Sequence, residues 1–306
     1  MFIRSSALIY PSLYLLTLGA TCRYAVCGED GSITLSDPGA SAHIPALIDR
    51  LSRLGLDPSN VSNIILTHLD FDRCAGMALL RRACPKARLC GTAAMKATIG
   101  SGGFVDELLR ADRHLYERIP TLQASKLPSH NELSDALHID RLLVETDSIQ
   151  LEDGLTIRSV STPGHRAHST SYLVVPHEFI ITDETLGYYR GSRLAAPGAD
   201  TSITRSLQSI AQFDHLEVSG IGFPYGGAVT GTLARRHLSS IRQNSRDLIE
   251  QYQAALRDGV SAESAQHQVW EAFYESAIHD PFLAGSLRGS FDAIMSQLSR
   301  LTHEDA

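Results

Sequence analysis

Short β-rich runs alternate with helical periodicities through the first two thirds of this chain. Ile64-Ile65-Leu66 is an apolar run bounded by polar residues, and a helical pattern follows it from about Ala75 to Ala83. Ala87–Cys90 repeats the strand pattern, with another helical pattern at Ala93–Ile99. Such alternation is typical of α/β folds, in which helices cover the faces of a sheet. We therefore expect an α/β domain.

The pattern changes twice along the chain. Residues 101–147 contain helical segments and no strand pattern, which indicates an insertion, and strand patterns resume between residues 148 and 182. The last 75 residues contain amphipathic helical patterns and no convincing strand. We therefore predict a domain over residues 1–232, with a helical insertion at about 101–147, and an all-helical C-terminal extension over residues 233–306.

The composition excludes several classes of protein. The chain has 306 residues and a net charge of -7, which disfavours a nucleic-acid partner because such binding needs a dense basic surface. The apolar stretch Ala7–Ala20 contains Pro11 and is too short to cross a bilayer, so a pair of strands is expected there and no membrane partner. The five cysteines form no CxxC pair, which favours reduced thiols and a cytoplasmic protein.

The segment Thr67-His68-Leu69-Asp70-Phe71-Asp72-Arg73 is the most informative for chemistry. It directly follows a predicted buried strand, and alternate side chains of an extended segment point the same way. His68, Asp70 and Asp72 are therefore candidates for binding one metal ion. A polar loop with an aspartate-rich helix cap explains the same residues equally well.

Three later loops have similar character. Thr162-Pro163-Gly164-His165 ends one predicted strand, and Thr182-Asp183 ends the apolar run Phe179-Ile180-Ile181. A glycine-rich turn, Gly222–Gly227, contains Tyr225. Loops at strand ends are where a rigid sheet commonly presents functional side chains.

In order and spacing these motifs resemble the metallo-β-lactamase superfamily, whose signature is T-H-x-H-x-D-H, then T-P-G-H, an aspartate after a strand, and a final G-H-G. The resemblance covers about residues 10–232. It implies an αββα sandwich, with two mixed sheets face to face and helices outside. The helical extension resembles the branch that contains lactonase-like and thioesterase-like members.

Carried over position by position, the resemblance is incomplete. The matching residues are His68, Asp72, His165 and Asp183, the last as the bridging carboxylate. The departures, each where the family has a histidine, are Asp70, Arg73 and Tyr225. His168, three residues after His165, is expected to contact a ligand residue rather than the ion.

These departures predict at most one ion. A carboxylate at position 70 can still bind a divalent cation, whereas the guanidinium of Arg73 stays protonated and cannot. We expect Arg73 to pair with Asp72 in place of the second ion. The predicted ligands are His68, Asp70, His165 and Asp183, with His68, His165 and Asp183 converging on one point. The ion would be zinc, iron or manganese. The alternative that the protein binds no metal is also open.

Three functions remain open from the sequence. The first is hydrolysis of an ester-like bond in a small molecule, such as a thioester or lactone, with a single metal ion and with Asp72, Arg73 and Tyr225 as catalytic residues. The second is oxygen or redox chemistry at a mononuclear non-haem iron, because two histidines with carboxylates also suit iron. The third is a non-catalytic binding or regulatory protein. The apolar C-terminal helices would suit a homodimer as well as a core.

Overall fold

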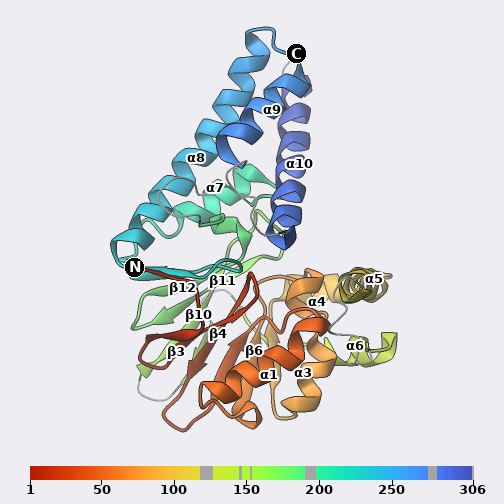
Figure 1. The fold of residues 1–306 in the computed structure, drawn as a ribbon, viewed down its shortest axis with the longest axis vertical. Helices are drawn as coiled ribbons and strands as arrows, with labels where there is room; N and C mark the ends of the chain where they lie inside the picture. Colours follow the sequence, from red (N-terminus) through yellow and green to blue (C-terminus); the bar gives the residue numbers. More distant parts are fainter. Residues whose placement is uncertain (118–126, 145–146, 152–153, 190–197, 275–280, 305–306) are drawn as a thin grey trace. The chain divides into compact units, whose positions relative to one another are not determined.

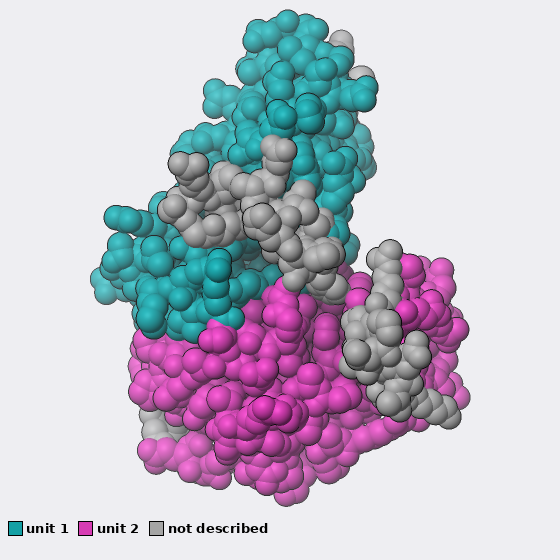
Figure 2. Space-filling view, in the orientation of Figure 1, with its two compact units in different colours: residues 1–4, 161–171, 178–306 teal, residues 5–160, 172–177 magenta. Residues whose placement is uncertain are grey.

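The computed structural model describes residues 1–117, 127–144, 147–151, 154–189, 198–274 and 281–304 (Figure 1). The chain divides into two compact units, which Figure 2 shows in two colours. The first unit contains residues 1–4, 161–171 and 178–306. The second contains residues 5–160 and 172–177. Each unit is described here by itself.

The strands form two seven-stranded mixed sheets. One sheet has the order β2 (Ala7–Tyr10), β3 (Leu13–Leu18), β4 (Thr21–Cys27), β5 (Ile33–Ser36), β6 (Val61–Ile65), β7 (Arg88–Gly91) and β8 (Arg141–Leu142). The other has the order β1 (Phe2–Ile3), β14 (Ala228–Thr230), β13 (Gly220–Gly222), β12 (Phe179–Ile181), β11 (Thr170–Val175), β10 (Thr156–Ser161) and β9 (Ser148–Gln150). Together with the helices they confirm the predicted αββα sandwich.

The second unit begins with the strand pair predicted for the apolar N-terminal stretch. β2, β3 and β4 pair antiparallel, whereas β5, β6, β7 and β8 pair parallel to one another. In the parallel register Ser36 of β5 lies beside Ile65 of β6, so the loops that follow these two strands start side by side. This register sets the position of Asp37 against Thr67 and His68.

Helices cover the outer face of this sheet, where α1 and α3 lie in Figure 1. The helices of the unit are η1 (Ser41–His43), α1 (Ile44–Arg53), η2 (Pro58–Asn60), α2 (Phe71–Cys74), α3 (Met77–Ala83), α4 (Ala93–Ile99), α5 (Phe104–Glu117) and α6 (His130–Ala136). α1 buries Ile44, Leu47 and Leu51, which recur every three to four residues, against the sheet residues of one apolar core. On β11, the Tyr172 hydroxyl donates to the Leu66 carbonyl at 2.7 Å and ties that strand to the end of β6.

The first unit contains the helices η5 (Glu184–Leu186), α7 (Ile203–Ala211), α8 (Thr232–Arg257), α9 (Ala262–Phe273) and α10 (Pro281–Glu304). α8, α9 and α10 pack through one apolar cluster that contains Tyr252, Val269 and Phe291. Every element after β14 in the described residues is a helix, as the sequence predicts. Among the described residues, no helix combines the length and apolar character that crossing a membrane requires.

One short strand lies within the predicted insertion. The sequence has no strand pattern over residues 101–147, yet β8 lies at Arg141–Leu142 and pairs with β7. The strand has two residues, which is too short to produce an alternating pattern. α5 and α6 lie in the same segment, while residues 118–126 and 145–146 lie outside the described residues. The domain boundary at residue 232 stays a proposal. It coincides with the start of α8, whereas the two compact units divide the chain elsewhere.

Candidate metal-binding residues

In the second unit, His68 is held by a buried chain of hydrogen bonds. The Asp37 carboxylate accepts from the Thr67 backbone N–H at 2.8 Å and from the Thr67 hydroxyl at 2.9 Å. The same hydroxyl lies 3.1 Å from His68 Nδ1. Because the hydroxyl proton goes to Asp37, Thr67 Oγ1 can accept from His68 Nδ1–H. In the neutral ring, that tautomer would place the Nε2 lone pair where a metal ligand needs it.

Asp70 provides a carboxylate next to that lone pair. Its Oδ2 lies 3.6 Å from His68 Nε2, and the two residues offer ligand atoms close enough to share an ion. Asp70 is the N-cap residue of α2, but its carbonyl accepts the helix N–H groups of Arg73 and Cys74, and its side chain makes no cap bond. The backbone of Asp70, and not its side chain, therefore caps the helix. The Asp70 carboxylate is left for other contacts.

Arg73 lies in the interior and pairs with Asp72, as the sequence predicts. Its Nη2 is 3.2 Å from Asp72 Oδ2, and the Arg73 side chain has no exposed surface. Arg23, also fully buried, donates to the Asp72 carbonyl at 2.8 Å. Gly39 allows this approach, since a Cβ there would lie 2.7 Å from Arg23 Nη2. Two guanidinium groups thus contact Asp72, the residue that the resemblance assigns to a second ion.

Burial dominates the protonation of the groups around these arginines. Burial raises the pKa of Asp37, against the opposing effect of the Arg73 and Arg23 charges. Burial, with the nearby Arg23 charge, lowers the pKa of His43 to about 4, so this histidine is neutral near pH 7. Burial also raises the pKa of Cys74, whose thiol donates to the carbonyls of Leu69 and Asp70. Cys74 is therefore a packed thiol rather than a nucleophile.

In the first unit, His165 has an arrangement similar to that of His68. Its Nδ1 lies 3.3 Å from Asp200 Oδ1, and its Nε2 lies 3.5 Å from Glu184 Oε2. The His165 ring thus lies between two carboxylates, that of Asp200 on its Nδ1 side and that of Glu184 on its Nε2 side. A metal ion could bind between Nε2 and the Glu184 carboxylate, with Asp200 orienting the ring from the other side.

Asp183 lies at the start of η5. Its Oδ1 accepts from the Thr185 backbone N–H at 3.0 Å, and Asp183 and Glu184 offer carboxylate oxygens within 4.8 Å of each other. Both side chains are buried. The Thr185 hydroxyl donates to the Thr162 carbonyl, and it accepts a hydrogen bond from the His165 backbone N–H at 3.3 Å. This links the two loops that carry His165 and Asp183.

Sequence reasoning missed Glu184 and Asp200. The run Asp183-Glu184 after a strand was a usable signal for Glu184, since both carboxylates follow the same apolar run. Asp200 lies 35 positions after His165 in a segment with no motif, and the sequence contains no signal for it. Although burial alone would raise the pKa of Asp200, hydrogen bonds from His165 and Ser290 with the charges of His165 and Arg166 hold it lowered.

Tyr225 and His168 lie in different surroundings. Tyr225 is buried in the turn before β14, with its ring 6.1 Å from that of Tyr188, and belongs to the apolar cluster of the C-terminal helices. His168 is half-buried in the loop before β11. The predicted roles of both residues remain predictions.

Each unit therefore supplies half of the predicted ligand set. His68 and Asp70 come from the second unit, and His165 and Asp183 come from the first. Imidazole nitrogens and carboxylate oxygens fit one divalent ion, while the Arg73–Asp72 pair does not fit a second. Convergence of the four residues on one ion remains a prediction.

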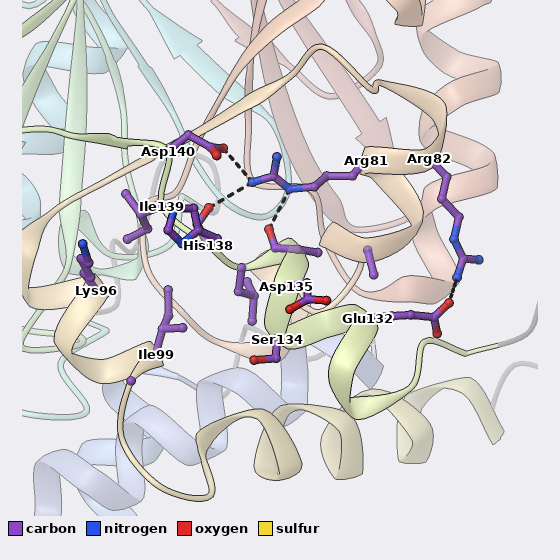
Figure 3. A pocket seen from close by; sticks show the side chains of 14 residues that line it. Arg81, Arg82, Lys96, Ile99, Glu132, Ser134, Asp135, His138, Ile139 and Asp140 are labelled. Atoms are coloured by element: carbon purple, nitrogen blue, oxygen red, sulfur yellow. Dashed lines mark hydrogen bonds and ion pairs between the residues drawn. The ribbon is translucent and has the colours of Figure 1, made fainter.

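The second unit also has a cavity of about 840 Å³ that is lined by none of these residues (Figure 3). It lies among α3, α4, α6 and residues 137–140. The Arg81 guanidinium donates to the carbonyls of Ala136 and His138 and to Asp140, and Arg82 pairs with Glu132. These charged side chains thus hold the wall of the cavity together.

Comparisons with known proteins agree with this fold. A family model described as the metallo-beta-lactamase superfamily matches residues 23–217. Among solved structures, a metallo-beta-lactamase family protein from Thermus thermophilus is 18% identical, with a TM-score of 0.65 over 98% of this chain and 96% of that one. An archaeal superfamily protein from Sulfolobus tokodaii is 17% identical, with a TM-score of 0.59 over 98% of both chains.

A metallo-beta-lactamase from Cronobacter sakazakii, a mutant of its HARLDQ motif, is 18% identical, with a TM-score of 0.55 over 98% of both chains. At these identities the likeness extends to the fold alone. A comparison with curated proteins found no match.

Proposed function

Since this chain belongs to the metallo-beta-lactamase superfamily, we propose that it is a metal-dependent hydrolase of an ester-like bond, a thioester or a lactone, with one divalent ion. The observation that carries the proposal is the paired arrangement of His68 and His165. In each, Nδ1 faces a polar side chain, Thr67 or Asp200, and Nε2 lies beside a carboxylate. Such outer contacts orient metal-binding histidines in proteins.

The proposed ligands are His68, Asp70, His165 and Asp183, and Glu184 joins them as a further carboxylate beside His165. An ion held there would act as a Lewis acid on the substrate carbonyl and lower the pKa of a water molecule. Zinc, manganese and iron all suit this mixture of imidazole and carboxylate.

The chain's own residues would take over the remaining steps. Asp70, whose side chain is partly exposed, is the better placed of the two aspartates to accept a proton from water. Asp72 is engaged by Arg73, and its proposed role is to hold that guanidinium. Arg73 would then stabilise negative charge on the substrate oxygen through its field, and Tyr225 through its hydroxyl.

The test is hydrolysis of a panel of thioesters and lactones by protein purified without chelators, with metal content measured on the same samples. We expect His68→Ala to lose the metal and the activity together. His267→Ala, an exposed histidine on α9, is the matched control and should change neither. Hydrolysis that persists in His68→Ala without metal would refute the proposal.

A second candidate is an oxygen-dependent enzyme with a single iron. The two histidines with neighbouring carboxylates favour it, because that ligand set also suits non-haem iron. Iron in the purified protein, with substrate-dependent oxygen consumption and no hydrolysis, would identify this function. Protein that binds no metal and turns over no substrate would instead point to the third function, a binding or regulatory role.

We also propose a small-molecule substrate and a cytoplasmic location. The location rests on the five cysteines, none of which forms a disulfide.

A further inference from the structure

A second cavity, of about 450 Å³, lies in the first unit, away from the residues discussed so far. One wall is a single face of α8, because Arg235, Arg242 and Arg246 recur at intervals of seven and four residues. The remaining lining residues come from the segment 213–218, which follows α7. The volume of the cavity lies within the range of small-molecule sites.

The charge of this cavity is strongly positive for an acidic chain. Three arginines and one aspartate line it, an excess of two positive charges in a protein whose net charge is -7. Arg242 pairs with Asp214. Arg235 and Arg246 are exposed, and within the described part of the chain no carboxylate lies within ion-pairing distance of either. Arg242 Nε is buried and has no hydrogen-bond acceptor among the described residues.

The rest of the lining is apolar or neutral. Leu216 and Leu238 contribute apolar surface, and Ser239 contributes a hydroxyl between the arginines on α8. Gln243 donates its amide to Asp247 at 2.6 Å. A ligand that fits this surface has an anionic group for the arginines and an apolar part for the leucines.

The cavity in the second unit differs in this respect. There Arg81 is paired with Asp140 and Arg82 with Glu132, and the lining also contains Lys96 and Asp135, so cations and carboxylates are equal in number (Figure 3). The cavity on α8 is therefore the better candidate for an anion.

We propose that the α8 cavity binds a small organic phosphate, with Arg235 and Arg246 as its principal contacts. Guanidinium groups bind phosphate oxygens through paired N–H donors, and such charge-assisted bonds are about twice as strong as neutral ones. None of the proposed hydrolytic residues lines this cavity, and the proposal does not depend on the proposed function.

The experiment is calorimetric titration of the full chain with phenyl phosphate. We expect saturable binding that weakens about tenfold or more in Arg235→Gln/Arg246→Gln, because two charge-assisted contacts are lost. Arg236→Gln is the matched control, since Arg236 lies on the same helix but does not line the cavity. Asp214→Asn removes the carboxylate that pairs with Arg242, so it should tighten binding.

A phosphate can also bind a metal ion, so the titration is repeated with His68→Ala. Binding retained in that variant supports the α8 cavity, whereas loss there overturns the proposal. An equal loss with Arg236→Gln would mean general charge attraction and would also overturn it. Benzoate binding more tightly than phenyl phosphate would overturn the assignment of phosphate, and a titration that does not saturate would overturn the site.

Discussion

The Thr67 hydroxyl lies between a buried carboxylate and a candidate metal ligand. It donates to Asp37 and contacts His68 Nδ1, so it links the buried carboxylate to the imidazole. Both residues that it contacts are buried. The identity of residue 67 should therefore determine how well His68 Nε2 is presented.

We expect Thr67→Val to weaken metal affinity about 10- to 100-fold, the usual loss when an outer contact of a ligand is removed. Valine keeps the shape of the side chain but cannot form a hydrogen bond with His68 Nδ1. Thr67→Ser should restore the affinity, and Thr98→Val, which changes an exposed hydroxyl on α4, should leave it unchanged. Metal competition titrations provide the measurement. Equal affinity in Thr67→Val and the native chain would contradict this role.

We expect Arg73 to limit the number of bound metal ions. A unit charge about 4 Å from a divalent cation costs about 8 kcal/mol at an effective dielectric of about 20. We therefore expect one ion or none per native chain, and an additional ion in Arg73→His/Tyr225→His, which restores two imidazoles. Metal analysis of both proteins provides the count. Two tightly bound ions in the native chain would show that the Arg73–Asp72 pair does not exclude the second one.

Residue patterns predicted candidate ligands at strand ends and missed two further carboxylates, Glu184 soon after β12 and Asp200 far from any strand. His68 and His165 each follow a strand end, where motif and position agree. Asp200 is brought to His165 by the fold, through contacts with Ser290 and Arg166 that lie far apart in sequence. Tyr225 was predicted to replace a ligand, and the structure surrounds it with aromatic and aliphatic side chains that no local pattern indicates.

At the scale of elements, long amphipathic helices and apolar strands were predictable because burial follows their periodicity. α1 and α8 are examples, with buried residues at intervals of three and four. β8 was not predictable, because its two residues become a strand only by pairing with β7. The division into two compact units was also missed. Residues 161–171 group with the last third of the chain through contacts between elements that are distant in sequence.

His237 on α8 should make stability depend on pH. Burial lowers its pKa to about 4, and its ring Nε2 lies 2.6 Å from the Leu186 carbonyl. Between the unfolded value of 6.5 and about 4, the unfolded chain binds a proton that the folded chain does not. The free energy of unfolding therefore falls as pH is lowered through this window, by at most about 3 kcal/mol.

His237→Gln should remove this part of the pH dependence, because glutamine keeps a donor for Leu186 but does not titrate. Chemical denaturation at several pH values between 4 and 7 measures it. His267→Gln, an exposed change on α9, should retain the native slope. The same slope in His237→Gln as in the native chain would mean that His237 does not titrate differently in the folded state.

At the scale of the molecule, the C-terminal helices share their core with earlier residues. Tyr188, Ala199, Ile203 and Tyr225 belong to the same apolar cluster as Tyr252, Val269 and Phe291. The Gln297 amide of α10 also donates to the Ala199 carbonyl and accepts from the Ile203 backbone N–H. The proposed boundary at residue 232 therefore separates secondary structures but not hydrophobic cores.

We therefore expect a fragment of residues 1–232 to aggregate or to lose the tertiary structure of its last third. Removing the helices would expose the buried tyrosines Tyr188 and Tyr225. Burial of one large apolar side chain stabilises a fold by about 1.5–3 kcal/mol. Near-ultraviolet circular dichroism and size-exclusion chromatography would follow the loss, and co-expression with residues 233–306 should reverse it. A monomeric fragment with the native thermal midpoint would instead show that residues 1–232 fold as an independent domain. Size-exclusion chromatography of the full chain also tests whether the protein forms a homodimer through its apolar helices.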